Sequence, residues 1–281
     1  MFVVTGATGN VGRSLVRALA AAGAPVTATS RGISEGDVPD GVRWRRADLT
    51  EAETLRPVFD GARALFLQNG GPSAHLLSPR DLLGAAKAGG VGRVVLLSSQ
   101  GVATRPESAS HGGVGRAVED AVRESGLEWT ILRPGGFDSN AFAFAESVRG
   151  ARTVAAPFGD VGLPLVDPLD IALVAAQALR EDGHGGRIHT LTGPALVTPR
   201  QQAEAIGGAL GEPVRFVEQT HDGARTAMLR FMPEPAVDTT LAILGRPRAE
   251  ELRISPDVQQ VLGRPARTFA EWAGDHVAAF R

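Results

Sequence analysis

The sequence predicts an α/β protein with a doubly wound parallel sheet, followed by a small α+β C-terminal lobe. Three features support this prediction. From Met1 to about Pro134, short aliphatic runs alternate with helical patterns, as in a parallel sheet covered on both faces. Three glycines separate the first apolar run from the first helical pattern. Beyond Pro134, the alternation gives way to segments rich in Phe, Pro and Gly.

The alternation resolves into six expected strands with helices between them. The strands are expected at Met1–Thr5, Val26–Ser30, Val42–Arg46, Ala64–Leu67, Arg93–Ser98 and Trp129–Leu132. Helices are expected at Val11–Ala22 and Leu82–Ala88, each ending near a glycine, as helices commonly do. The pattern Thr50-x-x-Glu53 predicts a capping box that opens a third helix.

Residues 1–136 are expected to form the sheet domain and residues 137–281 the C-terminal lobe, with some later segments returning to the main sheet. A helix is expected at Pro168–Arg180, with Asp167 as its cap and proline in its first turn. Further strands are expected at Arg187–Leu191 and Val214–Val217, and a last amphipathic helix at Thr268–Phe280. A chain of 281 residues that is 43% hydrophobic can bury a sizeable core.

The glycine turn indicates a dinucleotide site. Gly6, Gly9 and Gly12 follow the first expected strand and lead directly into a helix. Glycines allow backbone amides to approach a pyrophosphate closely, and the helix N-terminus adds unpaired N–H groups and a partial positive charge. Followed by repeated βα units, this spacing is typical of a Rossmann-type fold that binds NAD(P).

The end of the second expected strand favours NADP(H) over NAD(H). An NAD-specific site places Asp or Glu there to bind the ribose 2′-hydroxyl, whereas this chain has Thr29-Ser30-Arg31. A guanidinium beside a hydroxyl suits a 2′-phosphate; the alternative is that Arg31 is a solvated loop charge. Asp48 is expected either to accept a hydrogen bond from the adenine amino group or to support the next helix. The residues expected at the cofactor are Gly6, Thr8, Gly9, Asn10, Val11, Gly12, Ser30, Arg31, Asp48, Leu49, Gln68, Asn69 and Ser98.

The sequence resembles the NmrA-like, or atypical, branch of the short-chain dehydrogenase/reductase superfamily over nearly its whole length. The resemblance rests on TGATGNVG at residues 5–12, VVLLSSQGV at 94–102, SGLEWTILRPGGF at 125–137, VDPLDIA at 166–172, LTGP at 191–194 and the closing RTFAEWAGDHVAAFR. It implies a Rossmann domain with a small C-terminal substrate lobe. It also implies that Pro134, Gly135 and Phe137 lie against the nicotinamide side of the cofactor.

The chain departs from this family at the catalytic pair. The resemblance implies a Tyr-x-x-x-Lys pair after the fifth strand, but the chain has no Tyr, and its one Lys, Lys87, precedes that strand. The two positions hold His111 and Gly115 instead. His111, with an intrinsic pKa near ~6.5, is the best remaining proton donor, and Ser98 and Ser99 can donate hydrogen bonds to a carbonyl. The alternative for His111 is a solvated helix cap.

The missing phenol narrows the expected substrate class. Hydride transfer depends more on positioning than on an acid when the acceptor can hold the resulting charge. We therefore expect reduction of a quinone, activated carbonyl, enone or similar aromatic acceptor. The residues expected to line an apolar substrate pocket are Gln100, Phe137, Phe142, Phe144, Met228, Phe231 and Met232. Two other functions remain open: an NAD(P) redox sensor that acts through a protein partner, and a redox-neutral isomerase or cyclase that retains NADP.

Composition argues against several other classes. A net charge of −2 with scattered basic residues gives no electrostatic footprint for nucleic acid. No apolar stretch reaches the ~20 residues of a membrane-spanning helix, and zero Cys excludes disulfides and thiolate chemistry. No pair of the 6 histidines has metal-ligand spacing. We expect a cytoplasmic protein without metal that acts on a small molecule, and the resemblance is compatible with a homodimer.

Overall fold

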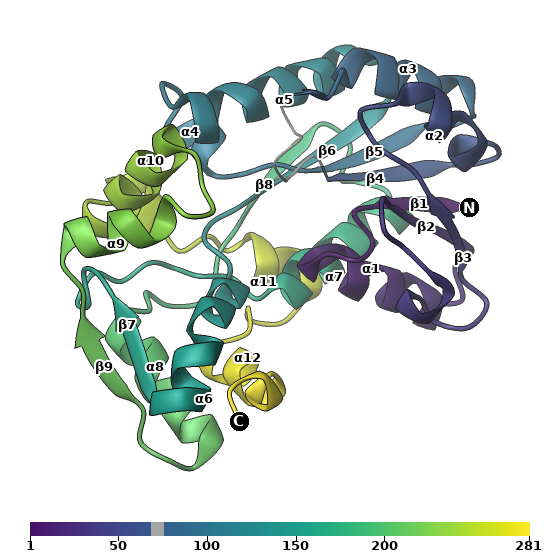
Figure 1. Cartoon of the computed structure of the whole chain (residues 1–281). Coiled ribbons are helices and arrows are strands. Elements are labelled where there is room, and N and C mark those ends of the chain that lie inside the picture. The colour runs from purple at the N-terminus through teal and green to yellow at the C-terminus, as the bar shows by residue number, and fades with distance from the viewer. Residues whose placement is uncertain (69–75) are drawn as a thin grey trace. The chain divides into compact units, whose positions relative to one another are not determined.

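The computed structural model describes residues 1–68 and 76–281 (Figure 1). The chain folds into two compact units. The sheet unit comprises residues 1–102, 113–134 and 168–190, and the C-terminal unit comprises residues 103–112, 135–167 and 191–281. Asn69 and His75, two residues considered in the sequence, lie outside the described residues.

The sheet unit is organised around a seven-stranded sheet with strand order β3-β2-β1-β4-β5-β6-β8. Neighbouring strands from β3 to β6 run parallel. The strands are β1 (Phe2–Thr5), β2 (Val26–Ser30), β3 (Arg43–Arg46), β4 (Ala64–Gln68), β5 (Arg93–Leu97), β6 (Glu128–Pro134) and β8 (Arg187–Leu191). The predicted α/β fold with a Rossmann-type parallel sheet is confirmed. The strand order reverses between β1 and β4, and ligands of such sheets bind at the carboxyl ends of the strands near this point.

Helices cover both faces of this sheet (Figure 1). On one face α1 (Asn10–Ala21) packs against α7 (Pro168–Arg180), which also contacts β4, β5 and β6. The other face carries α2 (Ala52–Phe59), α3 (Pro79–Ala88) and α5 (Val114–Glu124). Leu65 of β4, Leu82 of α3 and Val122 of α5 are fully buried in the core between the sheet and these helices, because a strand covered on both faces has no exposed side on which to place polar residues. The short helix α4 (Gly101–Thr104) follows β5.

The predicted capping box at Thr50 is wrong. Helix α2 begins at Ala52, with Glu51 in the N-cap position and no hydrogen bond from a capping side chain. The Thr50 hydroxyl instead donates to Asp48 Oδ1 at 2.8 Å, and the Thr50 N–H donates to the same oxygen at 3.0 Å. Asp48 therefore forms a local turn with Thr50, and α2 begins one residue later than a cap at Thr50 would place it.

The C-terminal unit contains a second, two-stranded parallel sheet of β7 (Thr153–Ala156) and β9 (Arg215–Glu218). Helices α6 (Ala145–Ala151), α8 (Pro199–Leu210) and α12 (Phe269–Asp275) surround a core that includes Trp272 and Phe280. The remaining helices are α9 (His221–Met228), α10 (Glu234–Gly245) and α11 (Asp257–Leu262).

Two local features of this unit differ from expectation. Strand β7 was not predicted, because its four residues Thr153–Ala156 contain a single branched aliphatic side chain. The expected last helix is shorter than predicted: α12 ends at Asp275, and a separate 3-10 helix forms at Val277–Ala279.

Candidate functional site

The glycine loop between β1 and α1 is shaped by backbone geometry that larger residues would disrupt. Gly6 has a φ of +61°, and a Cβ at this position would lie 2.4 Å from Gln68 Oε1. A Cβ on Gly12 would lie 2.2 Å from the Gly6 carbonyl oxygen. The positive φ favours glycine at position 6, and the contact with a backbone oxygen requires it at position 12, because real Cβ atoms do not approach so closely. The loop thus turns tightly enough to bring its amides toward a ligand.

The N-terminus of α1 is suited to an anion. Gly9 is its N-cap and supplies no side-chain hydrogen bond, and its first turn contains no acidic residue. The first amides of a helix lack intrahelical partners and carry a partial positive charge. The sequence thus leaves this helix end available to a negatively charged group such as a pyrophosphate.

A cavity of about 390 Å³ lies beside this loop, entirely within the sheet unit. Its lining residues are Thr5, Gly6, Thr8, Gly9, Thr29, Ser30, Arg31, Gly32, Ala47, Asp48, Leu49, Thr50, Gln68 and Leu77. Thr29 Oγ1 and Gln68 Oε1 are buried there without a hydrogen-bond partner among the described residues. Buried polar atoms of this kind usually bind a partner, so the cavity fits a ligand with hydroxyl or amide donors, as a dinucleotide has.

Eight of the residues expected at the cofactor line this one cavity. They are Gly6, Thr8, Gly9, Ser30, Arg31, Asp48, Leu49 and Gln68. Asn10, Val11 and Gly12 do not line it; they form the first turn of α1, where Val11 and Gly12 are buried.

The cavity lining includes the hydroxyl of Ser30, the guanidinium of Arg31 and the carboxylate of Asp48. Thr8 Oγ1 donates to Ser30 Oγ at 3.2 Å, which fixes the hydroxyl that precedes Arg31. Hydrogen bonds from the backbone and hydroxyl of Thr50 lower the pKa of Asp48, and the charge of Arg31 lowers it further. Asp48 is therefore ionised and already supports the turn before α2, the structural role that the sequence left open for it.

A buried carboxylate organises the carboxyl ends of β5 and β6. Ser98 Oγ donates to Glu119 Oε1 at 2.6 Å. Arg133 donates to both Glu119 oxygens, at 2.9 and 2.6 Å, and Arg123 donates to Oε2 at 2.7 Å. Glu119 itself is 0% exposed. Burial alone would raise its pKa, but the bonds from Arg133 and Ser98 lower it below the usual range.

This cluster changes the interpretation of Ser98. Its hydroxyl proton points to Glu119, so at this position Ser98 can offer a ligand only its oxygen lone pairs. Sequence reasoning missed Glu119 and Arg133. Their signal was a carboxylate beside the buried Val118 and Val122 of α5, together with an arginine in the apolar strand β6, because a charge on a buried face requires a partner.

The neighbouring expected residues form hydrogen bonds through both backbone and side-chain groups. Gln100 N donates to Pro134 O at 2.9 Å, and Ser99 Oγ accepts from Gly101 N at 3.1 Å. In the C-terminal unit, Gly135 N donates to Leu191 O at 3.0 Å, and Phe137 forms an isolated bridge with Val166.

Several expected pocket residues take part in packing within the C-terminal unit. The Phe142 ring lies 5.0 Å from that of Trp272 and 6.2 Å from that of Phe280, and Phe144 packs against the same core. Met228 and Met232 pack against the small cluster of Ala224, Val237 and Leu241. In contrast, Phe231 is 73% exposed.

The described histidines take part in local contacts. The backbone of His111 belongs to a π-helix at Ala109–Gly113, directly before α5, and the His111 side chain lies outside the described part of the chain. His184 and His189 contact each other, with Nδ1 and Nε2 3.3 Å apart. The described parts of the chain contain no group of three or more His, Asp or Glu that could hold a metal ion. No helix within residues 1–68 and 76–281 is long and apolar enough to cross a membrane.

Comparisons with known proteins agree with this geometry. A family described as NAD(P)H-binding matches residues 6–182. A reductase of Streptomyces griseus named (4-alkanoyl-5-oxo-2,5-dihydrofuran-3-yl)methyl phosphate reductase is 38% identical, covering 100% of this chain and 99% of the relative. The NAD(P)H azoreductase of Xenophilus azovorans is 33% identical with the same coverage.

Among solved structures, the NADPH complex of an NADPH-dependent quinone oxidoreductase from Escherichia coli has the same fold. It aligns with a TM-score of 0.80 at 22% identity, over 98% of this chain and 99% of that one. The chain therefore belongs to the NAD(P)H-binding family that matches residues 6–182 and is an NAD(P)H-dependent oxidoreductase.

Proposed function

We propose that this oxidoreductase uses NADPH in preference to NADH to reduce a small, conjugated, electron-poor acceptor such as an enone or a quinone. The observation that carries the proposal is the absence of Tyr from the sequence. Without a phenol to protonate a developing oxyanion, the acceptor has to spread the negative charge through its own conjugated system. A simple saturated ketone does not meet that condition.

The substrates named for the relatives support this class. The furanone of the Streptomyces reductase is an alkene conjugated with two carbonyl groups, and an azo compound is a conjugated acceptor as well. All of them can take up a hydride without simultaneous protonation of an oxygen. The proposed acceptor for this chain is therefore defined by conjugation and not by one functional group.

The cofactor is proposed to occupy the cavity beside the glycine loop. The loop amides and the N-terminus of α1 hold the pyrophosphate, and Ser30 and Arg31 bind the 2′-phosphate. Thr29 and Gln68, whose buried side-chain oxygens have no described partner, accept hydrogen bonds from the ligand. When bound, the dihydronicotinamide supplies a hydride.

The second hydrogen of the reduction is a proton, which we assign to His111 or to water. Hydride adds to one carbon of the activated alkene, and the resulting enolate takes up the proton at the neighbouring carbon. Residues 137–281 are proposed as the substrate lobe, with Phe137, Met228, Phe231 and Met232 as its apolar contacts. Phe142 and Phe144 are assigned to the core around Trp272 and not to the substrate pocket.

The proposal is tested by following NADPH consumption with a matched set of acceptors: an acyl butenolide, a quinone, an azo dye and a saturated ketone. We expect turnover with the conjugated acceptors and none with the ketone. Ketone reduction at a similar rate would contradict the proposal. Tight NADPH binding without turnover of any acceptor would favour the sensor function, and substrate conversion without net NADPH consumption would favour an isomerase.

The proton donor is tested separately with His111→Ala. For enone and activated carbonyl acceptors, we expect kcat to fall by about 10²-fold or more, the usual scale of a lost general acid, whereas quinone reduction should change much less. His221→Ala is the matched control, because His221 is an exposed histidine of the same unit that contacts Asp222. Unchanged enone and carbonyl turnover in His111→Ala would assign the proton to water.

A further inference from the structure

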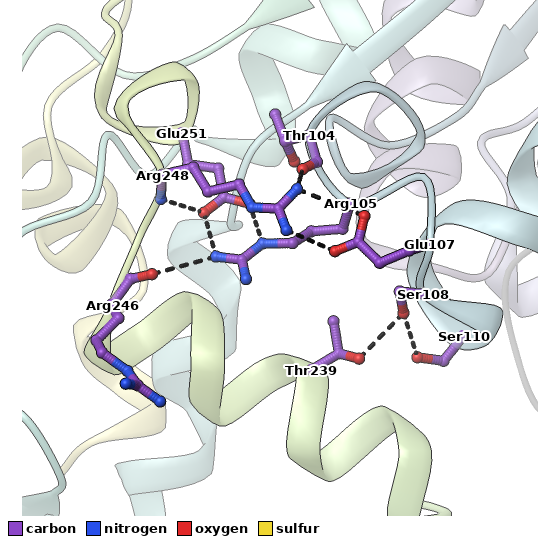
Figure 2. Close-up of polar contacts among 9 residues, drawn as sticks. All are labelled: Thr104, Arg105, Glu107, Ser108, Ser110, Thr239, Arg246, Arg248 and Glu251. Carbon is purple, nitrogen blue, oxygen red and sulfur yellow. Dashed lines mark hydrogen bonds and ion pairs between the residues drawn. The ribbon is translucent and has the colours of Figure 1, made fainter.

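The segment that carries His111 is held by the C-terminal unit. Residues 103–112 lie between β5 and α5 in the sequence, yet they group with residues 135–167 and 191–281. Figure 2 shows their polar contacts with α10 and with the residues that follow it. The end of this segment is the π-helix at Ala109–Gly113, a form that occurs often at functional sites.

A buried ion pair forms the centre of these contacts. Arg105 Nε donates to Glu251 Oε1 at 2.7 Å, and Arg105 Nη2 donates to Glu251 Oε2 at 2.7 Å. Arg105 is 8% exposed and Glu251 is 4% exposed. Burial alone would raise the pKa of Glu251, but the hydrogen bonds from Arg105 and from Arg248 N–H lower it. Both groups are therefore charged, and the two parallel bonds fix the guanidinium in one orientation.

Further hydrogen bonds complete the environment of the pair. Arg105 Nη2 also donates to the carbonyl oxygen of Arg246 at 3.2 Å, and Arg248 N donates to Glu251 Oε2 at 2.8 Å. The Arg248 guanidinium donates to the Thr104 carbonyl and to Glu107 Oε1 (Figure 2). Arg248 thus binds the backbone carbonyl that precedes Arg105 and the side chain of Glu107 that follows it.

A second set of contacts reaches the π-helix. The hydroxyls of Ser108 and Thr239 are 3.0 Å apart, and Ser110 Oγ donates to the Pro235 carbonyl at 3.3 Å. Both partners belong to α10. These contacts are partly or fully exposed, so each contributes little to stability by itself, but they bind the same segment to the same helix as the buried pair.

The backbone of Arg105 lies directly against the residue that follows His111. Ser108 N donates to Arg105 O at 2.9 Å, and Gly112 N donates to Ser108 O at 2.9 Å. A Cβ on Gly112 would lie 2.2 Å from the Arg105 carbonyl oxygen. Residues 105–112 therefore form a closed turn in which the Arg105 carbonyl packs against the backbone of Gly112, the residue after His111.

We propose that the Arg105–Glu251 pair is a positioning element for the proton donor: it fixes the turn that carries His111 to the segment after α10. The proposal rests on the proposed function, since it assigns the pair a role in placing that donor. A buried ion pair contributes little net stability compared with an apolar pair of similar size. Its bidentate geometry, in contrast, defines a position and an orientation, which a proton donor requires.

The test uses Glu251→Gln, which keeps the shape of the side chain and removes its charge, and Arg105→Lys, which keeps the charge and removes the bidentate geometry. Arg152→Lys is the matched control, because Arg152 pairs with Glu212 at the surface of the same unit. We expect kcat for an enone to fall on the order of 10-fold to 100-fold in both test variants, as for a catalytic group displaced by about 1 Å. The NADPH dissociation constant should stay within about twofold, because the cofactor cavity belongs to the sheet unit.

The pH profile and a double-mutant cycle separate positioning from general destabilisation. If the pair acts through His111, Glu251→Gln should remove the ionisation of the donor from the pH profile of kcat. It should also cause no further loss of kcat in the His111→Ala background. An equal fall in both backgrounds, or unchanged kcat in folded Glu251→Gln and Arg105→Lys, would overturn the proposal. Should Glu251→Gln fail to fold, the same double-mutant cycle is measured with Arg105→Lys and His111→Ala.

Hydrogen exchange distinguishes failure of this inference from failure of the proposed donor. The amides of Ser108 and Gly112 should exchange faster in Glu251→Gln than in the native chain and in Arg152→Lys. Unchanged exchange would show that the pair does not hold the turn, whatever His111 does. Faster exchange in Glu251→Gln, together with unchanged turnover in His111→Ala, would show that the pair holds the turn but that the turn does not carry the donor. That result would overturn both the positioning role and the assignment of His111.

Discussion

Replacing Arg31 tests the cofactor preference at the residue on which it depends. Arg31 is an exposed residue in the lining of the cavity beside the glycine loop, and it follows Ser30 in the sequence. A 2′-phosphate places about −1.5 to −2 charges there at neutral pH, whereas the 2′-hydroxyl of NADH places none. Arg31→Ala should therefore weaken NADPH much more than NADH.

The size of the effect follows from the exposure of the guanidinium. A hydrogen bond to a charged group contributes about 1.5–3 kcal/mol, and an exposed site belongs at the lower end because water screens the charge. About 1.4 kcal/mol corresponds to a tenfold change in affinity. We expect the NADPH dissociation constant to rise about 10-fold at low salt, with less effect at high ionic strength.

Parallel calorimetric titrations with NADPH and NADH measure this difference. Arg80→Ala is the control, because Arg80 pairs with Glu124 in the same unit and does not line the cavity. An equal loss of affinity for both cofactors would refute the role of Arg31 at the 2′-phosphate. In that case Arg31 would be a solvated loop charge.

Three further predictions concern the loop, the buried carboxylate and the C-terminal core. Gly12→Ala should destabilise the loop by about 1–3 kcal/mol through overpacking and abolish detectable NADPH binding by titration, whereas Gly84→Ala, at a helical position where a Cβ meets nothing within 4 Å, should retain full affinity. Glu119→Gln should lower the free energy of unfolding in urea by about 3–5 kcal/mol at pH 7. The pKa of Glu119 is lowered in the folded state, so its stabilisation is present above the unfolded pKa of about 4.3 and is lost as the pH falls through the folded pKa. The free energies of unfolding of the native chain and of Glu119→Gln should therefore converge in acid. A difference in unfolding free energy that stays constant with pH would contradict the assignment. Trp272→Ala should cost about 3–5 kcal/mol, and Phe142→Ala less, because Phe142 is 36% exposed.

The sheet and the glycine loop could be predicted because their signals are local. Strands such as Val26–Ser30 and the glycines at 6, 9 and 12 are encoded by consecutive residues, and the parallel arrangement follows from their alternation with helices. The helix Pro168–Arg180 was predicted with its observed bounds. The start of α2 was not, because Thr50 forms a turn with Asp48 and the helix begins after Glu51.

The polar clusters could not be predicted because their partners are far apart in the sequence. Glu251 lies 146 residues from Arg105, and nothing local in either segment indicates the other. Ser98 illustrates the consequence for function, since its position at the end of a strand was predicted but the direction of its hydroxyl toward Glu119 was not. Side-chain orientation depends on such long-range partners more than on the local pattern.

The chain passes from one unit to the other at five points, after residues 102, 112, 134, 167 and 190. A fragment that ended near residue 136 would lack both α7 and β8, so the sheet would lose its last strand and part of the cover on one face. Neither unit can therefore be exchanged between relatives as a cassette with a single junction. Chimeras that recombine cofactor preference with substrate preference need breakpoints at several of these passages, or point substitutions on an intact backbone.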